Sequence, residues 1–206
     1  MHARVQMTRN LPEQVRAPEA SGYLIKVLEG HPGFRGVHLM LQIGSRQGFS
    51  VTLWGSREDA IAASDRTEKA MGPRPFTLDF DEVYEVLATA PGLAAVGDAT
   101  VAQVTWFDGP RSAAQLDAMR RAGDERIQPA VERVPGHAGT YVLCHPEDSA
   151  MVVITLATST GALNEIADAV FGTSLLPGED PALLTGPDRI EVYTHEAHSL
   201  AEASVA

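Results

Sequence analysis

The sequence contains a single cysteine, Cys144, so the chain cannot form an internal disulfide. Cys144 stands in an alternating run, residues 140–145, which predicts a small buried apolar side chain rather than a reactive thiol. No apolar run approaches the roughly 20 residues that a membrane-spanning helix needs, and the first residues lack the apolar core of a signal peptide. These absences predict a protein of the cytoplasm that makes no membrane contact.

Basic side chains are also scarce, with 16 Lys and Arg against 27 Asp and Glu and a formal net charge of −11. The deficit is uneven, because residues 1–90 hold 10 basic and 11 acidic side chains whereas residues 91–206 hold 6 and 16. No basic stripe and no cluster of Lys or Arg interleaved with aromatic residues is present. The composition therefore predicts that nucleic acid is not a partner.

Several catalytic and metal-binding patterns are missing as well. The glycines of residues 44–48 join two alternating runs, so this segment is interpreted as a hairpin turn rather than a phosphate-binding loop. The histidines are scattered along the chain without metal-ligand spacing, and the pair His195 and His198 is interpreted as part of a solvated tail. No metal site and no Ser-His-Asp set are predicted.

The strongest local pattern runs through residues 32–72. Residues 37–42 alternate, the turn at 44–48 follows, and residues 49–54 alternate again. Ser56 then stands at a helix N-cap position with acidic residues in the first turn. The pattern predicts an antiparallel hairpin followed by a helix that begins just beyond Trp54.

Three motifs in this stretch resemble the antibiotic biosynthesis monooxygenase superfamily: the Pro32-Gly33-Phe34-x-Gly36 entry, the Thr52-x-Trp54 strand end and the Ser56-x-Glu58-Asp59-Ala60 helix start. The resemblance implies a small ferredoxin-like domain that pairs its sheet with a second copy in a dimeric α/β barrel. It specifies the fold better than the reaction, because the superfamily also contains haem-degrading enzymes and members of unknown activity.

The second half of the chain repeats the first at an offset of 103 residues. Pro135-Gly136-x-x-Gly139 matches Pro32-Gly33-x-x-Gly36, and Thr155-Leu156 matches Thr52-Leu53 at the same shift. Two independent matches at one offset indicate a tandem duplication. Residues 102–105 also echo residues 5–8, and both segments are interpreted as the first strand of a repeat.

Each half reads as βαββαβ, the ferredoxin-like order. In the first half we expect a strand at 2–8, a helix at about 10–29, the hairpin, the helix after Ser56 and a closing strand at 83–87. In the second half we expect helices at 112–131 and 161–171 and a closing strand at 189–194, with residues 88–98 as a linker.

The predicted fold class is α+β, with two ferredoxin-like βαββαβ repeats forming an intramolecular dimeric α/β barrel. The predicted domains are residues 1–90 and a diverged second copy at 98–198. A single such sheet exposes its edges, and the covalently attached second copy supplies the partner that covers them. The sequence leaves a further homodimer open.

Trp54 is the first candidate site residue, because a large ring at a strand end, at the Trp position of the family, would form the wall of a pocket. An aromatic core residue without a ligand is the alternative. The second repeat has Ala157 at this position, so any ligand pocket is predicted beside Trp54 in the first half. His38 is the second catalytic candidate, with a structural histidine as the alternative. The predicted substrate-binding residues are Trp54, Tyr23, Gln6 and Arg66.

Three functions stay open. The first is a cofactor-independent monooxygenase acting on an aromatic, polyketide-like small molecule in antibiotic biosynthesis, in which a deprotonated, electron-rich phenol reacts with oxygen in an apolar pocket. The second is a ligand-binding or structural member without catalysis. Haem degradation is a distant third, because the relatives that degrade haem carry a ligating His on the second helix and an Asn on the first strand, whereas residues 62–65 and 3–8 contain neither. No cofactor is predicted.

Overall fold

The computed structural model describes residues 1–15 and 17–201, which form two compact units. Unit 1 comprises Met1–Val86 together with the chain from Tyr193 onward, and unit 2 comprises Leu87–Val192. In the described residues, no helix is both long enough and apolar enough to span a membrane.

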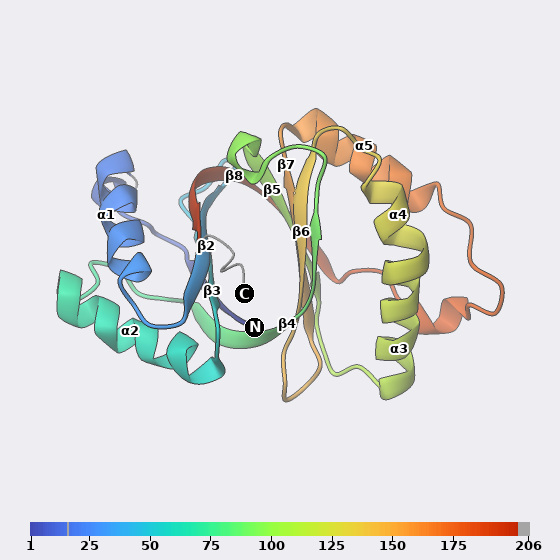
Figure 1. The fold of residues 1–206 in the computed structure, drawn as a ribbon, viewed down its shortest axis with the longest axis horizontal. Helices are drawn as coiled ribbons and strands as arrows, with labels where there is room; N and C mark the ends of the chain where they lie inside the picture. Colours follow the sequence, from blue (N-terminus) through green and yellow to red (C-terminus); the bar gives the residue numbers. More distant parts are fainter. Residues whose placement is uncertain (16, 202–206) are drawn as a thin grey trace. The chain divides into compact units, whose positions relative to one another are not determined.

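The first repeat contains one sheet layer and two helices on one of its faces (Figure 1). Pro18 occupies the first turn of α1, where its missing N–H leaves no hydrogen bond unmade. Ser56 caps α2 by accepting a hydrogen bond from the backbone N–H of Asp59 at 3.1 Å. The elements are β1 (His2–Thr8), η1 (Glu13–Val15), α1 (Pro18–Glu29), β2 (Phe34–Gln42), β3 (Gly48–Trp54), α2 (Arg57–Met71), β4 (Phe80–Pro91) and η2 (Val96–Asp98).

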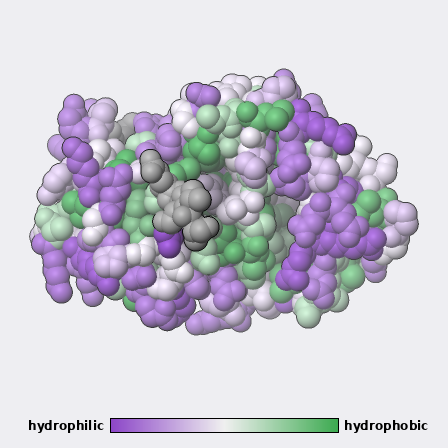
Figure 2. All heavy atoms as spheres, in the orientation of Figure 1, coloured by the Kyte–Doolittle hydropathy of each residue, from purple (hydrophilic) through white to green (hydrophobic). Residues whose placement is uncertain are grey.

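The second repeat has the same order. Its first helical segment is nearly continuous, with a π-helical turn, η3, between α3 and α4. Figure 2 shows that the surface over α3 and α4 is mostly hydrophilic, in keeping with the acidic composition of this half. The elements are β5 (Val101–Phe107), α3 (Ala113–Ala122), η3 (Gly123–Ile127), α4 (Gln128–Val131), β6 (His137–Cys144), β7 (Met151–Ala157), α5 (Thr160–Phe171), η4 (Pro181–Leu183) and β8 (Arg189–Leu200).

The strands are hydrogen-bonded in the order β1-β3-β2-β8-β5-β7-β6-β4, and β4 pairs antiparallel with β1, so the order is a closed ring. The predicted fold class, two ferredoxin-like repeats in one dimeric α/β barrel, is therefore confirmed. The units divide β4 after Val86 and β8 after Val192. The domain boundaries drawn from the repeat alone, 1–90 and 98–198, stay a prediction.

Strand registers show which residues of the two repeats are equivalent. Trp54 pairs with Phe34, and Ala157 pairs with His137, so the offset of 103 holds across β2, β3, β6 and β7. Each pairing also carries a register shift at the same place, next to Phe34 and next to His137. On the first strands, His2 and Val101 occupy matching positions, 99 residues apart. The sequence echo between residues 5–8 and 102–105 is therefore two residues out of register.

Three predicted elements differ from the observed ones. The helix expected at 10–29 is split into η1 and α1, because Pro18 starts a new helix. The closing strand expected at 83–87 is longer and takes up the start of the predicted linker. The tail interpretation of His195 and His198 is wrong, because β8 continues to Leu200 and these residues pair with β2.

Candidate functional site

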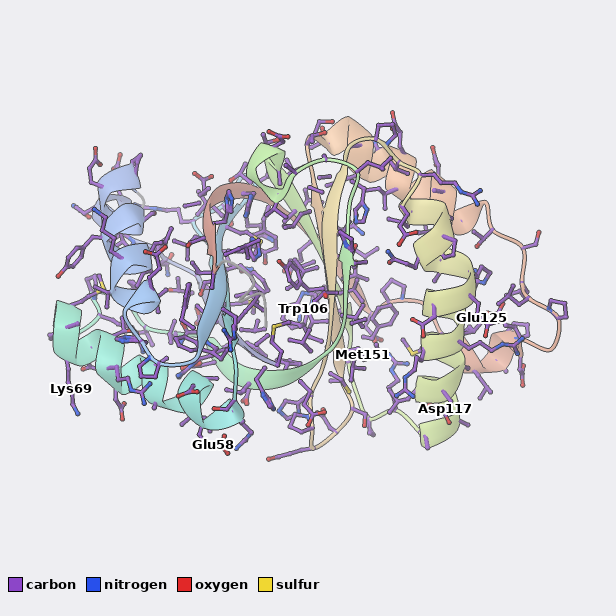
Figure 3. The ribbon with its side chains drawn as sticks, viewed as in Figure 1. Glu58, Lys69, Trp106, Asp117, Glu125 and Met151 are labelled. Carbon is purple, nitrogen blue, oxygen red and sulfur yellow. The ribbon has the colours of Figure 1, made fainter. Side chains whose placement is uncertain are left out.

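A cavity of about 390 Å³ lies in unit 1. Its floor is the face of β1, β2 and β3 that carries α1 and α2, its walls are residues of these two helices, and the segment 72–78 closes one side. The outward side of α2 is solvated, and Glu58 and Lys69 point away from the sheet there (Figure 3). The cavity is therefore enclosed by elements of one unit only.

Trp54 lines this cavity at the end of β3 and is fully buried. Its indole Nε1 donates a hydrogen bond to Thr52 Oγ1 at 2.8 Å, and its ring meets Phe34 edge-on with centroids 5.7 Å apart. Just beyond it, the Gly55 N–H donates to the Gly33 carbonyl at 2.7 Å. These contacts hold the ring in one orientation as an apolar wall.

Arg4 and Gln6 present polar groups from β1, but both are engaged. The Arg4 guanidinium contacts the Asp81 carboxylate through two nitrogens at 2.6 and 2.7 Å. It also donates to the carbonyls of Ala60 and Ile61 at 2.9 and 3.1 Å, which ties α2 to the sheet. Gln6 Nε2 donates to Asp81 at 3.1 Å. Arg4 is therefore a structural cation with its charge balanced.

Arg74 is the other cation that lines the cavity among the described residues, and the sequence did not single it out. It donates to the Ser64 hydroxyl on α2, and within residues 1–15 and 17–201 it makes no ion pair. Arg74 stands between two prolines, Pro73 and Pro75, whose fixed φ angles restrict the conformations open to this segment. The local sequence predicts only a Pro-rich turn at this segment. No local pattern indicates that this turn folds over a cavity.

Tyr23 also lines the cavity, from α1, and its side chain is 54% exposed, so it lies at the opening. Arg66 is not among the lining residues. Its Nη1 lies 3.7 Å from Asp59 Oδ1. Burial of His31 is the main reason that the pKa of His31 is lowered, and the positive charge of Arg66 lowers it further. A substrate-binding role for Arg66 stays a prediction that the cavity geometry does not support.

His38 lies on the opposite face of the sheet from the cavity and is fully buried. Its Nδ1 is 3.1 Å from His195 Nε2, and its ring stacks with that of His198 at 6.2 Å. Burial, followed by the charges of His195 and His198, lowers the pKa of His38 to about 3. His38 is therefore neutral at neutral pH, and its catalytic role stays a prediction without support from the cavity.

The structure thus brings together Trp54, Gln6 and Tyr23 of the predicted set, adds Arg74 and Thr52, and leaves His38 and Arg66 outside. Among the described residues, no group of three His, Cys, Asp or Glu side chains is placed to hold a metal ion. Cys144, predicted to be buried, is partly exposed and its Sγ lies 3.7 Å from the His145 carbonyl oxygen.

The equivalent region of unit 2 is packed differently. Ala157 replaces the indole and is fully buried, and His137 replaces Phe34 with its Nε2 2.8 Å from Thr140 Oγ1. Around Ala157 the sheet and helices pack through an apolar cluster that consists of Val101, Val131, Val134, Ala162, Leu163 and Ile166. These side chains, rather than a large ring, fill the space between sheet and helices.

No protein-family model matches the sequence, and no curated protein matches it. Solved structures do match over nearly the whole chain. A protein of Fusobacterium nucleatum subsp. nucleatum, provisionally named a monooxygenase, superposes with a TM-score of 0.71 at 10% identity and covers 97% of this chain and 94% of its own.

An anthrone oxidase-like protein gives a TM-score of 0.58 at 14% identity, with 100% of this chain and 95% of its own covered. A ferredoxin-fold protein of Listeria monocytogenes, related to antibiotic biosynthesis monooxygenases, gives 0.51 at 11% identity, with 94% of each chain covered. The expected resemblance is confirmed as a full-length structural match to proteins of monooxygenase type. At these identities it establishes the fold alone.

Proposed function

We propose that the cavity of unit 1 binds a hydroxylated aromatic, polyketide-like molecule and that molecular oxygen oxidises it there without a bound cofactor. The observation that carries this proposal is the cavity itself, about 390 Å³ with Trp54 as an apolar wall and Arg74 as a cation without an ion-pair partner in the described chain. Cavities of this size bury much of a small aromatic ligand.

The chemistry requires an electron-rich ring that can lose a proton. Arg74 would stabilise the phenolate form and so lower the pKa of the bound phenol, with the proton passing to water at the opening beside Tyr23. The resulting carbanion gives electrons to oxygen. For an anthrone, the methylene carbon becomes a carbonyl: anthrone and one O₂ yield anthraquinone and one water.

Trp54, Gln6 and Tyr23 keep their proposed substrate-binding roles, and Arg74 joins them. Trp54 would act by positioning the ring through contact rather than by exchanging a proton, because its indole N–H already bonds Thr52. For His38 we propose no contact with the ligand, since it lies on the other face of the sheet. A place in antibiotic biosynthesis and in the cytoplasm remains part of this proposal and rests on the sequence.

Binding without catalysis is the second candidate. The two carboxylates that line the cavity, Glu68 and Glu196, are both exposed, so neither is a buried general base. This observation favours binding without catalysis. Haem degradation is third, because α2 carries no histidine over its whole length. Haemin added to the purified protein should therefore produce no Soret shift of histidine ligation.

The deciding experiment supplies an anthrone to the purified protein in air and measures oxygen uptake and quinone formation together. We expect one O₂ consumed per quinone formed, and at least a tenfold loss of kcat/KM in Arg74→Gln, because a hydrogen bond to a charged group is removed. Arg46→Gln is the matched control, since Arg46 is exposed on the β2–β3 turn. Tight anthrone binding with no oxygen uptake would favour the binding function instead.

A further inference from the structure

Thr52 occupies the middle of the cavity floor on β3. Its side chain is buried, and it lies on the same sheet face as Trp54, two residues further along the strand. The Trp54 Nε1 to Thr52 Oγ1 distance of 2.8 Å is that of a good hydrogen bond. Thr52 is therefore fixed by the residue that forms the cavity wall.

The direction of this bond is set by chemistry. An indole nitrogen can only donate, so the Thr52 oxygen is the acceptor and the hydroxyl hydrogen remains to be donated elsewhere. Among the described residues, the Thr52 hydroxyl accepts this bond from Trp54 and donates to none. Arg4, which pairs with Thr52 in the β1–β3 register, is itself a donor and is occupied by Asp81 and two carbonyls.

We infer that the Thr52 hydroxyl donates a hydrogen bond to an oxygen atom attached to the rings of the aromatic ligand held against Trp54. This inference rests on the function proposed above and specifies the ligand further: an aromatic molecule whose phenolate or carbonyl oxygen lies beside the indole. Accepting a hydrogen bond from the indole polarises the hydroxyl and strengthens it as a donor. Thr52 thus recognises oxygen, and Trp54 orients Thr52 while contacting the ring.

The other repeat provides a matched control. Thr155 occupies the equivalent strand position, is similarly buried, and has Ala157 two residues further on. No indole orients the Thr155 hydroxyl, and the adjoining space is filled by the apolar cluster around Ala157. Thr52→Val and Thr155→Val each remove one hydroxyl group. The same chemical change is therefore made once beside the cavity of unit 1 and once in the packed region of unit 2.

The test measures binding of two probes that share a three-ring skeleton. One is 1,8-dihydroxyanthrone, which carries hydroxyl and carbonyl oxygens, and the other is 9,10-dihydroanthracene, which carries no oxygen. Binding is followed anaerobically by quenching of tryptophan fluorescence in the full chain and in its variants. We expect Thr52→Val to weaken binding of the oxygenated probe about tenfold and to leave binding of the oxygen-free probe unchanged. Thr52→Ser should restore the oxygenated probe to within about twofold, and Thr155→Val should change neither.

A second readout follows the indole N–H resonance of Trp54, which should move in Thr52→Val but not in Thr155→Val. If Thr52→Val weakens the binding of both probes equally, Thr52 only supports the cavity wall. If Thr52→Val binds the oxygenated probe with wild-type affinity, Thr52 makes no contact with the ligand. Either result overturns the inference and leaves the proposed function standing. If the wild-type chain binds neither probe, both proposals are wrong.

Discussion

The two units share one order of strands and helices, yet unit 1 contains a cavity beneath its helices and the matching region of unit 2 is filled by an apolar cluster. The difference begins at one pair of positions. Trp54 packs edge-on against Phe34, whereas Ala157 lies beside His137, which bonds Thr140. In unit 1 the ring belongs to an apolar cluster with Ala60 and Ala63 of α2 and also borders the cavity, whereas in unit 2 Ala157 belongs to a cluster without a large ring. Fold and cavity are therefore separable properties of this duplication.

Substitutions at Trp54 and Ala157 are expected to have the largest effect on the stability of the two units. Trp54→Ala removes a fully buried indole and should lower the free energy of unfolding by about 3–5 kcal/mol. Ala157→Trp inserts a ring into a filled region and should cost about 1–3 kcal/mol or more. Urea denaturation measures both. Phe171→Ala, at a side chain 82% exposed, is the control and should stay within about 0.5 kcal/mol. A fully stable Trp54→Ala would mean that the ring is not part of the core.

Acid should act through His38. Its folded pKa of about 3 lies below that of an unfolded histidine, near 6.5, so only the unfolded chain binds this proton between those values. The contribution of His38 to stability is complete above pH 6.5 and declines as the pH falls toward 3. The expected loss is roughly 2 kcal/mol at pH 5. Urea unfolding at pH 7 and pH 5 measures it, and His38→Leu should lessen the decline by that amount. An unchanged decline in His38→Leu would contradict the assignment.

Alkali should act at the equivalent position of unit 2, which is Tyr141. Burial raises its pKa to about 12, above the value of 10 for an exposed tyrosine, so the unfolded chain releases this proton first. The contribution of Tyr141 is complete below pH 10 and is lost as the pH rises toward 12, by roughly 1.4 kcal/mol at pH 11. Unfolding monitored at pH 9 and pH 11 tests this. Tyr141→Phe should lack the alkaline loss, and an equal loss in that variant would point to another group.

The smallest effect should be equal in the two units. Ser56 and Ser159, 103 residues apart, both cap helices by accepting a backbone N–H at 3.1 Å. Replacing either serine with alanine should lower the free energy of unfolding by about 1 kcal/mol. Thermal or urea unfolding of the two variants measures this, with Ser174→Ala as the control, because Ser174 is exposed and its hydroxyl makes no hydrogen bond within the described residues. A difference between the caps above about 1 kcal/mol would show that the units differ in more than their packing.

Features that depend on residues close together in the chain could be predicted from the sequence. Alternating runs and cap residues predict the hairpin and the helix after Ser56, because strand period and capping act over a few residues. The offset of 103 predicts the duplication and the equivalence of Trp54 with Ala157, which the strand registers confirm. The position of Trp54 at a strand end was also evident from this local pattern.

Contacts between residues far apart in the chain could be identified only from the folded structure. Arg4 and Asp81 are 77 positions apart, and His38 and His195 are 157 apart. Such contacts depend on how β4 and β8 extend and pair, and no periodicity within a short window reports that. For the same reason a Pro-rich turn gave no sign that Arg74 lines a cavity. Packing of the whole unit, rather than local preference, places these side chains, so they become visible only once the chain has folded.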